Sequence, residues 1–212
     1  MNDMLQAPAI DPLPSAPLLE RFLFEQPLIP VVVLAILAIV AAIAFASRGQ
    51  RRRGLLIAVV LAAVAAGVYA AASMVTTERE RLLERTAALI AATATVDMAS
   101  LNRLLTEDAS LRASGDIERA LGSIEGLAEI MDQAEYRLQG RYRITDWEIH
   151  DRQATLDGPN VGRTLVRVGV DVESFGRTHY SWWRLHWERT PDGQWRCFEI
   201  EPRWIQFVGS AR

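Results

Sequence analysis

The chain is poor in the residues that metal sites, disulfides and nucleic-acid surfaces need. Of its 212 residues one is cysteine, three are histidine and none is lysine, so all 23 basic side chains are arginine. The single Cys197 excludes an internal disulfide and a cysteine-rich zinc site. The net charge is −3 and no long basic face occurs, so we expect no nucleic-acid partner. The histidines, His150, His179 and His186, lack ligand-like spacing, and we expect no metal and no cofactor.

Charged residues are also missing from two long stretches, residues 26–47 and 54–77. Each is long enough to cross a hydrocarbon core of about 30 Å as a helix. A buried helix of a soluble protein would be shorter and would carry a polar stripe. A cleaved signal peptide would begin basic, whereas residues 1–27 hold four acids and one arginine. Neither stretch contains an acidic residue, a basic residue or a histidine, which argues against a transporter core and leaves a two-helix anchor as the prediction.

The link between the stretches, residues 48–53, is rich in arginine and has no acid. Short loops of this kind stay in the cytoplasm. We therefore predict a hairpin over residues 26–77 in a bacterial inner membrane, with the bilayer as its first partner. The tail 1–25 and the domain 78–212 would both lie outside the cytoplasm. The residues expected to set this orientation are Arg48, Arg51, Arg52 and Arg53.

The N-terminal tail and the hairpin carry two weaker patterns. Four prolines mark residues 1–17 as extended or disordered, and residues 18–24 fit either an interfacial helical turn or a flexible lead-in. Small residues recur every four positions in both spans, which predicts close helix packing or merely reflects abundant alanine. These small residues are Ala38, Ala42 and Ala46 in the first span and Ala63, Gly67 and Ala71 in the second.

The start of the domain has a helical pattern. Thr77 followed by Glu80 fits a capping box, and Asp97 fits the cap of a second helix that carries Leu105 on its apolar face. Apolar spacing then predicts one long helix over residues 116–139, ending at a glycine. Strand patterns follow over residues 141–151, 164–173, 177–190 and 194–207, with a turn signal at 191–193. The order predicts an α+β domain in which helices pack on one face of a curved antiparallel sheet.

Alternation along the strands separates two faces of this sheet. In the stretch 164–173 the valines lie on one face, and Arg167 and Asp171 lie on the other. In the aromatic stretch 177–190, Trp183 and Trp187 would fill the core beneath the helices. The side chains that then face outward, beside Arg167, are Tyr180, Trp182, Arg184 and His186.

Three segments carry a resemblance to a known family: VDMASLNRLLTEDASL, TLVRVGVDVE and YSWWRLHWERTPDGQWRCFEIEP. With them, residues 78–207 resemble the nuclear transport factor 2-like family, also called the cystatin-like cone fold. This family contains enzymes, ligand binders, assembly factors and inert scaffolds. Its enzymes place an Asp base with a Tyr donor, or an Asp–His pair, inside the cone. The residues here that are able to play such parts are Tyr142, Asp146, His150, Asp171, Tyr180 and His186.

We expect no complete catalytic set, because Asp171 and His186 fall on the outer face by alternation. The prediction is a membrane-anchored, non-enzymatic scaffold, accessory or assembly subunit. Tyr180, Trp182, Arg184, His186 and Arg167 would bind other membrane subunits or a second copy, since Trp, Tyr and Arg are enriched at interface hot spots. The alternatives are that Trp182 is covered by the protein's own loop or tail, that the cone holds a small apolar ligand, or that the chain is a membrane-tethered lyase, isomerase or hydrolase.

Overall fold

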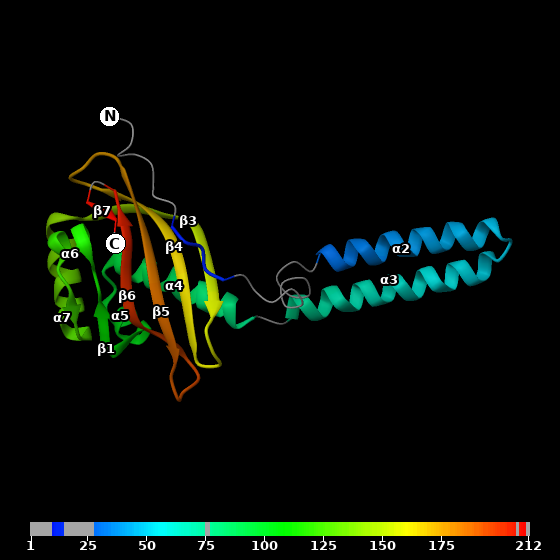
Figure 1. Ribbon diagram of the computed structural model, residues 1–212, viewed down its shortest axis with the longest axis horizontal. Helices are drawn as coiled ribbons and strands as arrows, with labels where there is room; N and C mark the ends of the chain where they lie inside the picture. Colours follow the sequence, from blue (N-terminus) through cyan, green and yellow to red (C-terminus); the bar gives the residue numbers. More distant parts are fainter. Residues whose placement is uncertain (1–9, 15–27, 75–76, 207, 211–212) are drawn as a thin grey trace. The chain divides into compact units, whose positions relative to one another are not determined.

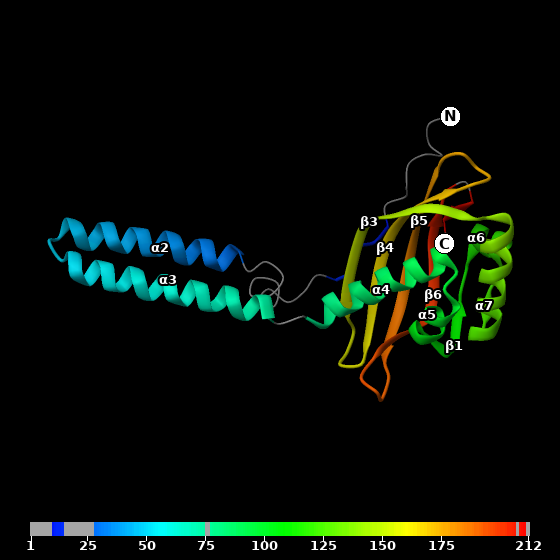
Figure 2. The same ribbon diagram turned by 180° about the vertical axis from the view of Figure 1, so that it is seen from behind.

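The computed structural model describes residues 10–14, 28–74, 77–206 and 208–210. The chain divides into two compact units. One is a helical hairpin, and the other is a domain that begins at Glu78 and also includes the N-terminal residues up to Pro14. Figures 1 and 2 label the helices and strands of both units.

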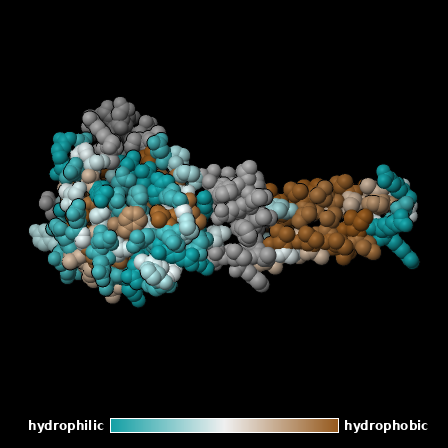
Figure 3. All heavy atoms as spheres, turned by 60° about the horizontal axis from the view of Figure 1, so that its bottom comes forward, coloured by the Kyte–Doolittle hydropathy of each residue, from teal (hydrophilic) through white to brown (hydrophobic). Residues whose placement is uncertain are grey.

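The hairpin consists of α2 (Leu28–Ser47) and α3 (Arg51–Met74), which lie side by side (Figures 1 and 2). Both helices are long and apolar enough to cross a membrane. Only 6% of the first apolar stretch and 11% of the second is buried within the protein, unlike a core helix of a soluble protein. Figure 3 shows this apolar surface along the hairpin, with polar atoms at its turn.

Close packing of the two helices depends on Gly54. A Cβ atom at this position would lie 2.8 Å from Cβ of Phe45 and 3.3 Å from the carbonyl oxygen of Ala42. Ala38 is 9% exposed and Ala65 is 7% exposed, which places both on the same contact between the helices. Small residues therefore let the backbones approach each other, as they do in many membrane helix pairs.

The small-residue pattern that the sequence predicts is only partly right. Ala38 and Ala42 face α3, but Ala46, Ala63 and Gly67 are exposed, and a Cβ atom at Gly67 would meet nothing within 4 Å. The side chain of Ala71 lies outside the described residues. An α-helix has 3.6 residues per turn, so residues spaced four apart are rotated progressively around the helix axis. After one or two such steps the small residue no longer faces the neighbouring helix.

The domain combines helices with one mixed sheet, so the predicted α+β class is confirmed. The helices are α4 (Glu78–Thr95), α5 (Met98–Leu104), α6 (Gly115–Leu121), α7 (Leu127–Ala134) and the π-helical η3 (Glu135–Arg141). The strands are β1 (Leu105–Leu111), β2 (Ile124–Glu125), β3 (Ile144–Leu156), β4 (Val161–Val172), β5 (Thr178–Arg189), β6 (Trp195–Ile205) and β7 (Gly209–Ser210).

The strands follow the order β2-β1-β6-β5-β4-β3, and β7 pairs with β6. Strands β3 to β6 form the predicted antiparallel meander. The turn between β5 and β6 contains Gly193, whose φ of +78° suits a glycine. Asp97 caps α5 as predicted, because its carboxylate accepts hydrogen bonds from the amide and the hydroxyl of Ser100 at 3.1 and 2.6 Å.

Two predictions about the first half of the domain are wrong. The single helix predicted over residues 116–139 is broken at Gly122 and Gly126, whose φ values of 73° and 91° end a right-handed helix. Leu105 leaves the helical face predicted for it and starts β1, which runs parallel to β6 and pairs Leu105 with Cys197. Burial on β6 outweighs the helical spacing at this point, since Leu105 is 1% exposed.

Helix α4 covers one face of the sheet, which we call the inner face; the opposite face is the outer face (Figures 1 and 2). A Cβ atom at Gly162 of β4 would meet Leu82 of α4 at 2.6 Å. Two positions along β4, the Thr164 hydroxyl lies 2.9 Å from that of Thr86 on α4. It also accepts a hydrogen bond of 2.9 Å from Nε1 of Trp187, which is fully buried.

This buried hydrogen bond confirms the predicted alternation along β5. Leu185 and Trp187 belong to the core, and Trp183 packs against it. Trp182 pairs with Arg167 of β4 on the outer face.

We predict that Trp187→Ala lowers the free energy of unfolding by about 3–5 kcal/mol, because it removes a fully buried indole. Trp182→Ala should cost about 1 kcal/mol, the typical loss for a residue outside the core. Urea unfolding of the full chain in mild detergent, followed by tryptophan emission, reports on the domain alone, since all six tryptophans lie between residues 147 and 204. A larger loss for Trp182→Ala than for Trp187→Ala would mean that the strand register is wrong by one residue.

Candidate functional site on the outer face

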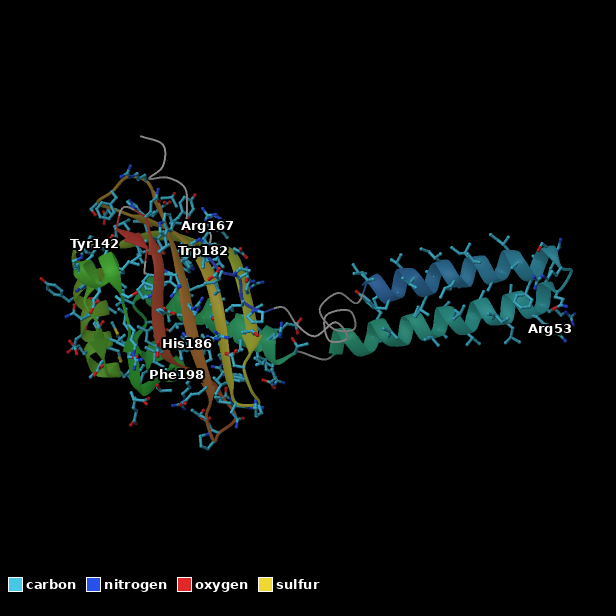
Figure 4. All side chains as sticks on the ribbon, in the orientation of Figure 1. Arg53, Tyr142, Arg167, Trp182, His186 and Phe198 are labelled. Atoms are coloured by element: carbon cyan, nitrogen blue, oxygen red, sulfur yellow. The ribbon has the colours of Figure 1, made fainter. Side chains whose placement is uncertain are left out.

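The structure brings the five predicted interface residues together on the outer face. Tyr180 pairs with Gly169, Trp182 with Arg167, Arg184 with Leu165, and His186 with Arg163. Paired residues of an antiparallel sheet point to the same side, so these side chains form a band along β4 and β5. Figure 4 labels Arg167 and Trp182 toward one end of this band, and His186 and Phe198 toward the other.

One end of the band is aromatic and depends on a glycine. A Cβ atom at Gly169 would come within 2.7 Å of Nε2 of His150 and 3.1 Å of the Tyr180 ring. Without it, the rings of His150 and Tyr180 lie 5.2 Å apart, centre to centre. The guanidinium carbon of Arg167 lies 4.9 Å from the centre of the Tyr180 ring, within the range of a cation–π contact.

The middle of the band is an ion cluster around Glu201 of β6. The carboxylate oxygens of Glu201 lie 2.5 Å from Arg203, 3.5 Å from Arg184 and 3.7 Å from Nε2 of His186. Interaction with the His186 imidazole, followed by the hydrogen bond and charge of Arg203, lowers the pKa of Glu201 from 4.5 to about 2. Glu201 therefore carries its charge at every physiological pH.

The guanidinium groups beside this cluster differ in their surroundings. Burial, and then the charge of Arg203, lowers the pKa of Arg184, while Glu201 and more weakly Asp11 oppose this effect. Further along β4, Arg163 donates two hydrogen bonds of 2.6 Å to Asp157, and these raise the pKa of Arg163. The outer face thus holds its arginines in fixed positions, which reduces the entropy lost when a partner binds.

Part of the outer face is covered by the N-terminal segment. The backbone amide of Leu13 donates a hydrogen bond of 3.0 Å to Oε1 of Gln153 on β3. Leu13 is 9% exposed, and Leu165 of β4, which pairs with Gln153, is 1% exposed although it lies on the outer face. Figures 1 and 2 show residues 10–14 crossing β3 and β4 on the side away from α4. The predicted tail is therefore extended and packed over residues 10–14; its other residues lie outside the described ranges.

Three of the tryptophans on the inner face donate their indole N–H groups to partners. Trp183 donates to Oγ of Ser181 at 2.7 Å, and Trp195 donates to Oε2 of Glu78 at 2.8 Å. Trp187 donates to Thr164, as described above. These side chains pack in the space beneath α4, in one cluster with Leu82 and Leu89 of that helix.

The residues considered for catalysis do not converge on that space. Asp171 pairs with Asp146 and Thr178 on the outer face. His150, Tyr180 and His186 also belong to the outer face, as described above. Tyr142 lies with its ring 5.8 Å from that of Phe175.

Two surface hollows lie away from the inner face of the meander. The larger, of about 450 Å³, runs between α4 and α5, and it is lined by alanines together with Arg85, Asp97 and Arg103. The smaller, of about 230 Å³, lies where α4 meets the turn between β5 and β6. Neither is lined by a residue of β3, β4 or β5.

Within the described ranges, no three His, Cys, Asp or Glu side chains come together as a metal site would require. His179 lies next to Phe175, with ring centres 4.7 Å apart, and burial followed by the charge of Arg177 lowers the pKa of His179. Burial raises the pKa of the Cys197 thiol to about 12. This thiol is fully buried and stays protonated, so it is a packing residue and not a nucleophile.

Sequence reasoning missed Glu201, Arg203 and the packing role of Gly169. Two β-bulges shift the register between β5 and β6, one between His186 and Trp187 and one between Trp182 and Trp183. Each bulge inverts the alternation along β6, so counting residues does not reveal which of them face outward. The only usable signal was the run of charged residues in the last strand.

Comparison with known proteins finds similar solved structures but no matching sequence family. No family model and no curated protein sequence matches the chain. Similar solved structures include a nuclear transport factor 2-like protein from Cytophaga hutchinsonii, with 14% identity over 60% of this chain and 98% of that one, at a TM-score of 0.49. A hexachlorocyclohexane dehydrochlorinase, LinA-type3, from Novosphingobium barchaimii has 12% identity over 62% of this chain and 88% of its own, at a TM-score of 0.48. The association domain of C. elegans CaMKII has 16% identity over 57% of this chain and 91% of its own, at a TM-score of 0.47.

We predict that Glu201→Gln flattens the acid side of the stability profile. Because the folded-state pKa of Glu201 lies below 4.5, its charge stabilises the fold above pH 4.5, and this stabilisation is lost as the pH falls toward about 2. Unfolding midpoints in urea should therefore drop less between these pH values in Glu201→Gln than in the wild type.

Glu173→Gln is the matched control, because this carboxylate is 65% exposed and lies 3.9 Å from Arg143. The account of the ion cluster is wrong if Glu201→Gln and Glu173→Gln have the same acid profile as the wild type.

Proposed function

We propose that the chain is a membrane-anchored, non-enzymatic accessory or scaffold subunit that docks on other membrane proteins through the outer face of its cone domain. The observation that carries this proposal is the contrast between the two faces of the sheet. On the inner face, Trp183, Trp187 and Trp195 pack with the core and have satisfied indole groups. The polar and aromatic side chains considered for chemistry are concentrated on the outer face, where a protein partner has access to them.

Three features support the membrane anchor and its orientation. The surfaces of α2 and α3 are almost entirely apolar and exposed, which suits lipid contact. The turn between the helices carries arginines and no acid, which favours a cytoplasmic turn in a bacterial inner membrane (Figure 4 labels Arg53). Residues 10–14 and the domain belong to one compact unit, so both must lie on the same side of a membrane, as two spans require.

The composition of the outer face supports docking over ligand binding. Trp182, Tyr180 and two arginines form a half-buried band, and these residue types dominate binding energy at protein interfaces. Ligand binding has one observation in its favour, the hollow of about 450 Å³ between α4 and α5. Its volume falls within the range of small-molecule sites, but alanines and exposed charged groups line it, with none of the aromatic side chains usual in such pockets. Catalysis would need an acid–base pair that the inner face does not assemble.

We predict that an added thiol at Ser210 reacts with a membrane-impermeant maleimide in intact cells, whereas one at Gln50 reacts only after the cells are opened. The wild type is the background control, because Cys197 is buried. Changing Arg51, Arg52 and Arg53 together to Glu should weaken this asymmetry. Labelling at Gln50 and protection at Ser210 in intact cells would place the domain in the cytoplasm.

We predict that Trp182→Ala weakens association with partners by about 2 kcal/mol or more, the loss expected of a hot spot. Purification in gentle detergent, with quantitation of the proteins that co-purify, measures this effect. Tyr136→Ala is the control, because Tyr136 is 79% exposed and comes from η3. If Trp182→Ala keeps every partner of the wild type, the outer face is not the docking surface, and ligand binding becomes the better proposal.

A further inference from the structure

One row of side chains across the outer face is already occupied by the chain itself. Gln153 of β3, Leu165 of β4, Arg184 of β5 and Glu201 of β6 are successive partners in the strand register. The row therefore presents a hydrogen-bond acceptor from β3, an apolar floor from β4 and an ion pair from β5 and β6. Residues 10–14 lie across the part formed by β3 and β4 (Figure 1).

The segment that lies there is pre-organised for an extended conformation. Its sequence is Ile-Asp-Pro-Leu-Pro, so Asp11 and Leu13 both precede a proline. Proline fixes its own φ near −65° and pushes the preceding residue out of the helical region. Little conformational entropy is then lost on binding, which is why proline-rich peptides are common ligands of protein grooves.

The contacts match the chemistry of the row. Pro12 and Pro14 have no backbone N–H group, so Leu13 is the only backbone donor among these three residues. Its N–H group donates a hydrogen bond to Oε1 of Gln153. Leu13 is nearly buried, and so is Leu165, which is paired with Gln153 in the sheet.

We propose that this row is a recognition site for an extended peptide in which a leucine stands between two prolines, and that the chain's own residues 10–14 occupy it in cis. Bound there, this segment covers the part of the row formed by β3 and β4. A partner with a peptide of this type would have to displace it. This deepens the proposed docking role, but the site itself rests only on the contacts described here.

The test uses the full chain in mild detergent with Leu165→Cys in a Cys197→Ala background. The thiol at position 165 should react slowly with maleimide, and Leu13→Asp should speed the reaction about tenfold or more, since it removes a buried leucine from the covering segment. Val161→Cys is the control: this position is 42% exposed, so its rate should not depend on Leu13. Equal rates for Leu165→Cys with and without Leu13→Asp would overturn the proposal.

Recognition is tested by adding a synthetic peptide with the sequence of residues 8–16 to the chain that carries Leu13→Asp and Leu165→Cys. The peptide should slow the labelling again, and the same peptide with Asp in place of its leucine should not. Failure of the native peptide to protect the thiol would show that residues 10–14 cover the site without being recognised by it.

If Leu165→Cys does not fold, hydrogen exchange tests the site in proteins whose cysteine content is unchanged. Hydrogen exchange of the Leu13 amide should be about tenfold or more slower in the wild type than in Gln153→Ala. Exchange at the same rate in both would overturn the hydrogen bond on which the site depends.

Occupancy in cis is tested with Leu13→Cys and Gln153→Cys together, joined by a short bismaleimide. A cross-linked monomer on a denaturing gel is expected, and a cross-linked dimer would contradict occupancy in cis by showing that copies exchange the segment. Failure of these tests while Trp182→Ala still releases partners would reject the peptide site and leave the docking function. If these tests succeed while Trp182→Ala keeps every partner, the peptide site is retained and the docking function is rejected.

Discussion

The architecture of the domain depends on one buried hydrogen bond, from the indole of Trp187 to the hydroxyl of Thr164. A polar group without a partner is costly at a fully buried position, so this pair fixes β5 against β4. The same threonine contacts Thr86 of α4, which fixes the helix against both strands. Because side chains alternate along a strand, anchoring Trp187 beneath the helix sends Trp182, Arg184 and His186 to the other side.

The two faces of the sheet consequently have different physical roles. The inner face gains stability from aromatic burial, and the indole N–H groups of Trp183, Trp187 and Trp195 all have partners there. The outer face holds charged side chains in pairs and clusters, of which the group around Glu201 is the most tightly coupled. Such clusters add little to stability where water reaches them, but they present arginine and histidine in fixed positions. That is a property of a binding surface.

Local patterns in the sequence predict much of this structure. Uncharged stretches predict the two apolar helices, alternation predicts the meander, and the position of Trp187 predicts which side chains of β5 face outward. Predictions fail where long-range contacts override local ones. Gly122 and Gly126 divide a helix that apolar spacing makes continuous, and Leu105 enters a strand because β6 offers it a partner. The bulges in β6 hide Glu201 and Arg203 from any count of alternating positions. The packing of Leu13 on β3 links residues 140 positions apart, and no local pattern predicts it.

The central claim is that the outer face, and not the helical side of the domain, meets other proteins. Photo-cross-linking in native membranes tests this most directly, with a photoreactive residue placed either at Trp182 or at Ala88, which lines the hollow beside α4. The account predicts discrete protein adducts from position 182 and none above background from position 88. Adducts from position 88 alone would contradict it and would assign the interaction to the groove between α4 and α5.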